Sequence, residues 1–166
     1  EISDIINKAL ILGQNNDFGY DYLRDFERRF EVKSRDPVTT GWKKFDEIMS
    51  DGLGRGELGV VISPTGTGKS HILVHLGAQA LKQGKTVVHY TFELADTMIA
   101  RRYDACLTGT PLSDLNTFKD QILEDIKEID GQLIVKEYPT KSATTVALRS
   151  HLEKLVNRDI DIGMII

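Results

Sequence analysis

A short apolar run that leads directly into a glycine-rich turn and then into a helix constrains this chain more than any other feature. Residues 58–70 read Leu-Gly-Val-Val-Ile-Ser-Pro-Thr-Gly-Thr-Gly-Lys-Ser. The run at 58–63 predicts a strand covered on both faces, and Gly66 and Gly68 lack the Cβ atoms that would keep the backbone from wrapping around a ligand. The segment therefore predicts a strand, loop and helix whose loop can enclose a small anionic group.

The chemistry of this loop indicates a site for a nucleoside triphosphate. Successive backbone N–H groups point into the turn, and the helix that begins near Lys69 adds its partial positive charge. Lys69 can reach the β- and γ-phosphates of ATP, and the hydroxyl of Ser70 is placed to bind Mg²⁺. The predicted nucleotide-binding residues are Ser63, Pro64, Thr65, Gly66, Thr67, Gly68, Lys69 and Ser70.

One position departs from the pattern G-x-x-x-x-G-K-[S/T] of phosphate-binding loops. Its first place is taken by Ser63 instead of glycine. A small residue can serve there if its φ angle is negative, whereas Gly68, Lys69 and Ser70 have no such latitude. The alternative interpretation is a strand-turn-helix crossover that contains Gly-Lys-Ser by chance.

Composition and charge limit the remaining function classes. The chain has 166 residues, 28% of them charged, and a net charge of -4, so it lacks the positive field of a protein that holds nucleic acid by bulk electrostatics. Any nucleic-acid contact must be local or lie outside this chain. Cys106 is the single cysteine, no apolar stretch approaches the ~20 residues that span a bilayer, and the N-terminus shows no secretory signal pattern. We expect a cytoplasmic protein without a membrane partner.

Hydrophobic spacing divides the chain into three expected parts. Residues 1–13 predict an amphipathic helix, and residues 14–57 predict a helical lead-in with helices near 19–31 and 40–49. Residues 58–166 predict the N-terminal part of an ATPase core.

Strand and helix patterns alternate along this third part. Strands are expected at 58–63, 86–92, 132–138 and 162–166, and helices near 69–83, 96–108, 116–129 and 143–157. Such alternation predicts an α/β fold with a mostly parallel sheet and helices on both faces. Residues 162–166 have the apolar character of a central strand, so we expect the domain to continue beyond Ile166 and to be truncated here at its C-terminal side.

Glu93 directly follows the predicted strand at 86–92. Because the carboxyl ends of strands in an open parallel sheet face the ligand crevice, Glu93 is placed to orient a water for in-line attack on the γ-phosphate. The alternative is that Glu93 begins a surface turn. His71 and His75 are four residues apart on a predicted helix, but no further ligand completes a metal site, so we interpret them as packing or surface histidines. Arg101 is expected to be solvated or paired with an acid such as Asp104.

Several separate pieces of the sequence between 40 and 102 together resemble the RecA-like motor domain of hexameric DnaB-type replicative helicases, including those of tailed phages. The pieces are Thr40-Gly41 with Phe45-Asp46, the lead-in at 54–58, the loop at 63–70, and Tyr90-Thr91-Phe92-Glu93-Leu94 followed by Arg102. The resemblance implies a P-loop NTPase with a RecA-like, mostly parallel sheet flanked by helices. It also implies that Glu93 and Lys69 are catalytic and that Arg102 lies near the nucleotide.

The same resemblance implies partners and missing parts. The family forms ring-shaped homo-oligomers, typically hexamers, that translocate on single-stranded DNA and work with a primase or a helicase loader. Residues 1–13 resemble the linker helix that docks on a neighbouring subunit. The Asp of the second acidic motif, the DNA-binding loops and the arginine finger are expected beyond Ile166. Because an arginine supplied by a neighbour contributes about 10³ to 10⁵ in rate, we expect the isolated chain to be inactive.

Other ATPases share this core. A RadA- or KaiC-like recombination or signalling ATPase is the main alternative to a helicase in a bacterial or phage-infected cell. A small-molecule kinase is disfavoured because about 57 residues precede Leu58, and a GTPase is disfavoured because no N-K-x-D motif occurs.

Overall fold

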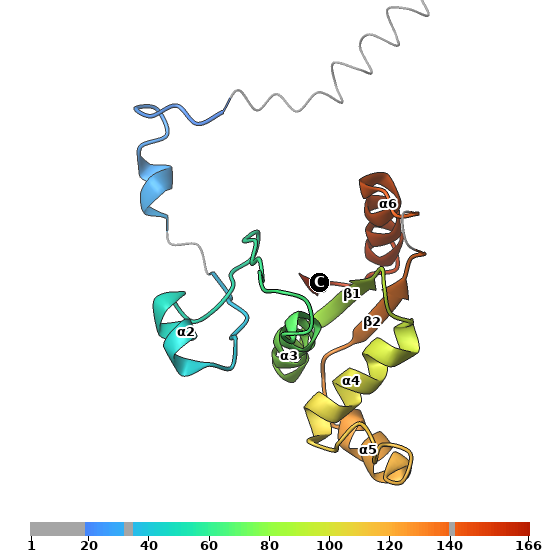
Figure 1. The fold of residues 1–166 in the computed structure, drawn as a ribbon. Coiled ribbons are helices and arrows are strands. Elements are labelled where there is room, and N and C mark those ends of the chain that lie inside the picture. The colour runs from blue at the N-terminus through green and yellow to red at the C-terminus, as the bar shows by residue number, and fades with distance from the viewer. Residues whose placement is uncertain (1–18, 32–34, 140–141) are drawn as a thin grey trace, which may run out of the picture. The chain divides into compact units, whose positions relative to one another are not determined.

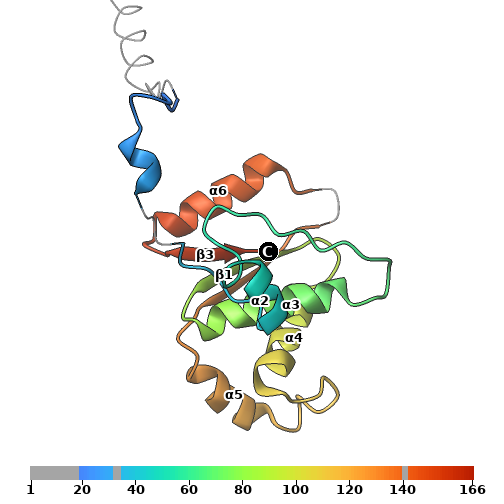
Figure 2. The ribbon, with the colours of Figure 1, turned by 90° about the vertical axis from the view of Figure 1, so that its left-hand side faces the viewer.

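The computed structural model describes residues 19–31, 35–139 and 142–166, and the helix expected over 1–12 lies outside them. Residues 35–166 form one compact unit, and the residues before them belong to a second. In the larger unit, helices cover both faces of a small sheet (Figures 1 and 2). This arrangement confirms the expected α/β fold, a parallel sheet flanked by helices. None of the described helices has the length and apolar character that crossing a bilayer requires.

The sheet contains three parallel strands in the order β2-β1-β3. Their bounds are Thr86–Thr91 for β1, Leu133–Glu137 for β2 and Ile162–Ile165 for β3. β1 lies in the centre and is buried along nearly its whole length, which explains its apolar sequence. Among the described residues β3 pairs only with β1, and every second residue of β3 is exposed. The second neighbour that a central strand at 162–166 would need is not among the described residues, so its central position stays a prediction.

Two helices cover one face of the sheet and a third covers the other. The helices after the lead-in are α3 (Lys69–Lys82), α4 (Asp96–Thr108), α5 (Lys119–Lys127) and α6 (Thr145–Val156). α3 and α4 pack on β1 through a core that includes Val74, Val87 and Tyr103. α6 packs on the opposite face, where Leu155 contacts the cluster around Val88. The sheet is therefore the middle of three layers, as the alternating pattern predicts.

The expected strand at 58–63 is wrong. This segment is irregular, and Leu58, Val60 and Ile62 are 87%, 70% and 88% exposed. A strand needs a hydrogen-bonded neighbour, and no strand among the described residues pairs with this segment. The apolar residues of 58–63 favour a buried strand. Whether a strand forms depends also on a second strand that pairs with it, and the residues of the segment do not specify that partner.

The helix expected over 19–31 is also wrong in type and extent. The described residues form turns followed by a single 3₁₀ helix, η1 (Glu27–Phe30). The aromatic side chains expected on one face, Tyr22, Phe26 and Phe30, are all exposed. A helix this short gains little from propensity alone. The exposed aromatic side chains contact one another and the Arg29 guanidinium, which lies over the Tyr22 and Phe26 rings at 4.2 and 4.7 Å.

Candidate phosphate-binding site

The loop before α3 has the backbone shape that its glycines predict. Gly66 and Gly68 have φ angles of 78° and 97°, in the left-handed region that disfavours side chains. A Cβ built on either glycine would meet nothing within 4 Å, so backbone conformation, and not crowding, is the reason for glycine here. α3 begins at Lys69 directly after this turn, which leaves the first N–H groups of the helix facing the loop.

Hydrogen bonds within the loop converge on two carbonyl groups. Lys69 Nζ donates to the carbonyl oxygens of Ser63 and Pro64, at 2.8 and 2.9 Å. Thr67 Oγ1 lies 2.7 Å from the Pro64 oxygen and 2.7 Å from Ser63 Oγ. The Lys69 ammonium thus lies back against the first two residues of the loop.

The phosphate loop and Glu93 lie at the same edge of the sheet. α3 has 14 residues and is about 21 Å long, and β1 has six residues and is about 20 Å long. α3 packs on β1 and is followed by it after a short turn, so the two run in opposite directions. The start of α3 at Lys69 therefore lies near the end of β1 at Thr91, and Glu93 follows two residues later.

A side-chain hydroxyl holds the turn that carries Glu93. Thr91 Oγ1 donates to the Leu94 carbonyl at 2.8 Å and accepts from the Leu94 N–H at 3.2 Å. The backbone N–H of Asp96, at the start of α4, also points to a carboxylate oxygen of Glu137 at the end of β2, 3.4 Å away. Glu93 itself is exposed to solvent.

Arg102 lies in the second turn of α4, beside the buried Tyr103. Its Nη1 atom is buried and has no hydrogen-bond partner among the described residues. An unpaired buried N–H group of a guanidinium is costly, so this atom is suited to an acceptor supplied from elsewhere. The neighbouring Arg101 donates to Asn116 Oδ1 at 3.0 Å, and its charge opposes the rise that burial causes in the pKa of Asp104.

The residues present fit a magnesium ion that binds mainly to nucleotide and water. Ser70 is exposed in the first turn of α3, and no group of three or more acidic, histidine or cysteine side chains gathers within the described ranges. Mg²⁺ commonly takes few protein ligands beside phosphate oxygens and waters, so one hydroxyl is sufficient here.

His75 packs on the lead-in: its Nε2 lies 2.8 Å from the Thr40 oxygen, and its ring stacks on Trp42 with 4.4 Å between centroids.

Sequence reasoning missed the clamp that holds the lead-in. Arg35 donates to both carboxylate oxygens of Glu57, at 2.8 and 2.6 Å, and also to the carbonyl oxygens of Met49 and Gly52. The Gly54 N–H donates to Glu57 as well, at 2.9 Å. The hydrogen bond from Arg35 lowers the pKa of Glu57 to about 2, with help from Gly54. No pattern in the sequence connects Arg35 with Glu57, so no signal in it could have found this pair.

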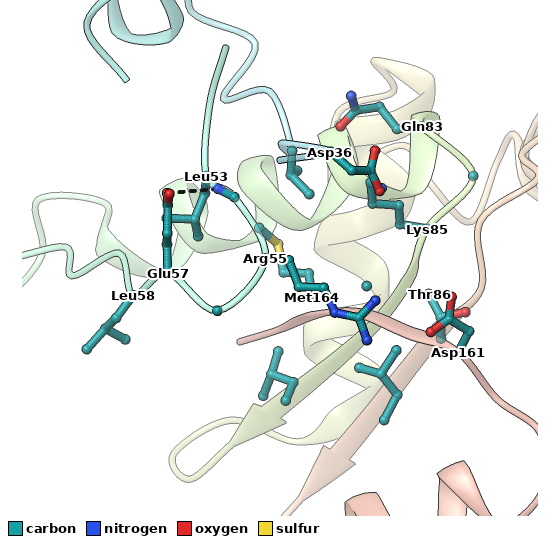
Figure 3. Close-up of a pocket in the computed structure, with 17 residues that line it drawn as sticks. Asp36, Leu53, Arg55, Glu57, Leu58, Gln83, Lys85, Thr86, Asp161 and Met164 are labelled. Atoms are coloured by element: carbon teal, nitrogen blue, oxygen red, sulfur yellow. Dashed lines mark hydrogen bonds and ion pairs between the residues drawn. The ribbon is translucent and has the colours of Figure 1, made fainter. Parts of the chain in front are cut away.

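A cavity of about 790 Å³ lies away from the predicted site, at the amino-terminal ends of β1 and β3. Figure 3 shows that its polar lining comes from separate segments of the chain, among them Arg55, Lys85 and Asp161. None of the predicted nucleotide-binding residues lines it. The cavity is therefore distinct from the phosphate loop.

The lead-in also contains a short helix, α2 (Lys43–Ile48), which confirms the helix expected there. Asp46 in this helix accepts hydrogen bonds from the hydroxyl of Thr39 and from the N–H and hydroxyl of Thr40. These bonds lower the pKa of Asp46. The Thr-Gly and Phe-Asp pieces of the resemblance thus form one local structure that packs on α3 through His75.

Comparison with known proteins supports the RecA-like reading. No protein-family model matches the chain. A DnaB-like replicative helicase of Enterobacteria phage T4 is 30% identical over 165 residues, which cover 93% of this chain and 34% of the helicase. A DNA repair protein RadA of Campylobacter jejuni is 28% identical over 99 residues, 58% of this chain and 22% of that protein. The chain thus spans about a third or less of either relative. It is homologous to part of a DnaB-like replicative helicase and, more weakly, similar to a RadA protein, as its RecA-like fold leads one to expect.

Proposed function

We propose that this chain is part of the ATP-driven motor of a replicative DNA helicase. The observation that carries the proposal is the similarity to the phage helicase, which extends over nearly the whole chain and therefore includes the phosphate loop and Glu93. The shared edge of the sheet supports it, because a triphosphate on the loop would place its terminal phosphate toward the turn that carries Glu93.

Each residue of the site has a proposed role. The backbone of 63–68 and the start of α3 bind the phosphates of ATP, with Lys69 turning from its carbonyl partners to the β- and γ-phosphates. Ser70 binds Mg²⁺, which neutralises charge on the phosphates when bound. Glu93 orients the attacking water, and the unpaired Nη1 of Arg102 donates to an acceptor of the assembled site.

The active form is proposed to be larger than this chain. We propose a cytoplasmic homo-oligomer, a hexameric ring around single-stranded DNA, served by a primase or a helicase loader. In this proposal residues 1–13 are the linker, 14–57 the lead-in and 58–166 the beginning of the ATPase core. The second acidic motif and an arginine from the neighbouring subunit complete the site.

The decisive experiment uses the full-length parent protein. It should hydrolyse ATP faster with single-stranded DNA and unwind a forked duplex with ATP. Lys69→Ala should abolish both activities while the unfolding temperature is unchanged, and Glu93→Gln should bind ATP normally but stop turnover. An ATPase that DNA does not stimulate would count against the motor, and normal hydrolysis by the Glu93 variant would remove that residue from the mechanism.

A RecA/RadA-like recombination or signalling ATPase is the second candidate, because the RadA protein also matches part of this chain. The same forked duplex separates the two. A recombination ATPase would coat the single strand as a filament and leave the fork paired, whereas a helicase would separate its strands.

A further inference from the structure

Ser63 stands where phosphate-binding loops carry glycine, and the structure gives this serine a partner. Its Oγ lies 2.7 Å from Thr67 Oγ1, which itself lies 2.7 Å from the Pro64 carbonyl oxygen. We propose that Ser63 and Thr67 are positioning residues that form a hydroxyl latch across the phosphate loop and hold it ready for nucleotide. This inference rests on the proposed function of the loop and explains its one departure from the pattern.

The number of hydroxyl hydrogens determines the direction of each hydrogen bond in the latch. Each hydroxyl has a single hydrogen to donate, and the Pro64 carbonyl can only accept. The hydrogen of Thr67 therefore goes to Pro64, and the hydrogen of Ser63 goes to Thr67 Oγ1. A chain of two hydrogen bonds results, from Ser63 to Thr67 to Pro64, in which each bond polarises the next.

The latch joins the first and fifth positions of the loop. Between them lie three residues, 64–66, which include the left-handed Gly66. These residues are exposed, so no packing against the rest of the unit restricts their conformation. A bond across the turn restricts them instead, and the conformational entropy lost on nucleotide binding is smaller for a loop already in shape.

The latch also keeps one carbonyl group hydrogen-bonded when Lys69 moves to a phosphate. In the described loop, Lys69 Nζ donates to the Ser63 and Pro64 carbonyl oxygens. To reach a phosphate it must leave both. Thr67 continues to donate to Pro64 after Lys69 has left, so that carbonyl keeps a partner and the release of Lys69 costs less.

The test compares ATP binding and turnover in full-length variants. Ser63→Ala and Ser63→Gly should each raise the KM for ATP by about three- to tenfold, the effect of one hydrogen bond, with kcat unchanged within about twofold. Thr67→Val should have a larger effect because it removes both bonds, and Thr67→Ser should restore nearly normal KM. The double variant Ser63→Ala, Thr67→Val should be no worse than Thr67→Val alone.

The unfolding temperature should stay at the wild-type value in all of them, since both hydroxyls are in exposed or half-buried positions. Ser113→Ala is the matched control, because it removes another exposed serine hydroxyl, which bonds to Asp114 at 2.8 Å. If the glycine variant binds ATP as well as wild type, or if the two single effects multiply in the double variant, the latch is overturned.

A separate variant distinguishes failure of the latch from failure of the proposed function. Lys69→Ala should lose ATP binding, and if it does not, the loop is not the nucleotide site. In that case hydrogen exchange of the loop amides still decides the latch: exchange should be faster in Ser63→Ala than in Ser113→Ala. Equal exchange rates would overturn it.

Discussion

Arg35 and Glu57 hold the lead-in together through hydrogen bonds between residues 22 positions apart. The planar guanidinium meets both carboxylate oxygens, a geometry that lysine cannot reproduce. Gly54 lies against this pair, and a Cβ there would lie 2.8 Å from Arg35 Cγ. At the residue scale, the lead-in is therefore shaped by one charged pair and the glycine that makes room for it.

Glu57→Gln should remove a pH-dependent contribution to stability. The pKa of Glu57 is lowered from 4.5 to about 2, so the unfolded chain takes up the proton first as pH falls. The stabilisation is complete above about pH 4.5 and is lost as pH falls toward 2. The difference in urea midpoint between wild type and Glu57→Gln should be constant from pH 6 to 8 and smaller at pH 3. An equal difference at pH 7 and pH 3 would contradict the clamp.

At the scale of secondary-structure elements, β1, α3 and α4 meet at one buried contact. His89 of β1 lies with its Nδ1 2.9 Å from the hydroxyl of Tyr103 on α4, and both side chains are almost fully buried. The same hydroxyl lies against Gly77 of α3, where an added Cβ would be 2.1 Å away. Because α3 begins with Lys69 and α4 carries Arg102, this contact sets how the two site-bearing helices sit on β1.

Gly77→Ala should destabilise the fold by overpacking, by about 1–3 kcal/mol. The added methyl group would force α4 away from α3, since Tyr103 cannot move within its buried position. Chemical unfolding of the variant measures the loss. Gly59→Ala is the control, because its Cβ would meet only Leu53 at ordinary contact distance, 3.7 Å. If both variants were equally stable, the close packing at Gly77 would be disproved.

His89 should make the fold less stable in mild acid. Burial lowers its pKa from 6.5 to about 4, so the folded chain keeps the imidazole neutral where the unfolded chain is already protonated. Its stabilisation is complete above about pH 6.5 and is lost as pH falls toward 4. His89→Gln should have a lower unfolding temperature than wild type at pH 7. Between pH 7 and pH 5, however, the unfolding temperature of the variant should fall by less than that of wild type. His71→Gln, at an exposed histidine, is the control, and identical profiles for wild type and His89→Gln would refute the assignment.

At the scale of the whole chain, the segment before the phosphate loop exposes several large apolar side chains. Leu58, Val60 and Ile62 are largely exposed, although the apolar run to which they belong is typical of a buried strand. Contiguous exposed apolar side chains mark contact surfaces or promote association. We therefore expect the segment to promote self-association of this 166-residue chain.

Replacing Leu58, Val60 and Ile62 together by serine should reduce self-association of the 166-residue chain and its binding of a hydrophobic dye. The unfolding temperature should change little, because exposed side chains contribute little burial. Sedimentation and dye fluorescence measure the first effect. Val146→Ser, at a 75% exposed site on α6, is the control. A large fall in unfolding temperature would mean that the segment is buried in solution.

Elements that depend on neighbouring residues were predictable from the sequence. The helices α3, α4 and α6 and the strands β1 and β2 lie where the apolar spacing and the glycines indicate, within two residues at each end. The loop glycines have the positive φ angles that a tight turn requires. Roles of Glu93, Lys69 and Arg102 in catalysis or binding remain predictions, although the topology brings the first two to one edge of the sheet.

The sequence alone determined the glycine-rich turn before α3 and the alternation of helices and strands that gives the α/β class, because both follow from backbone preferences and periodicities within a few residues. Only the tertiary structure decided that the described strands take the order β2-β1-β3, that 58–63 has no described strand neighbour, and that Arg35 meets Glu57 and His89 meets Tyr103. The physical reason is that pairing and burial depend on which distant segments meet, and the order of residues along the chain does not encode that locally.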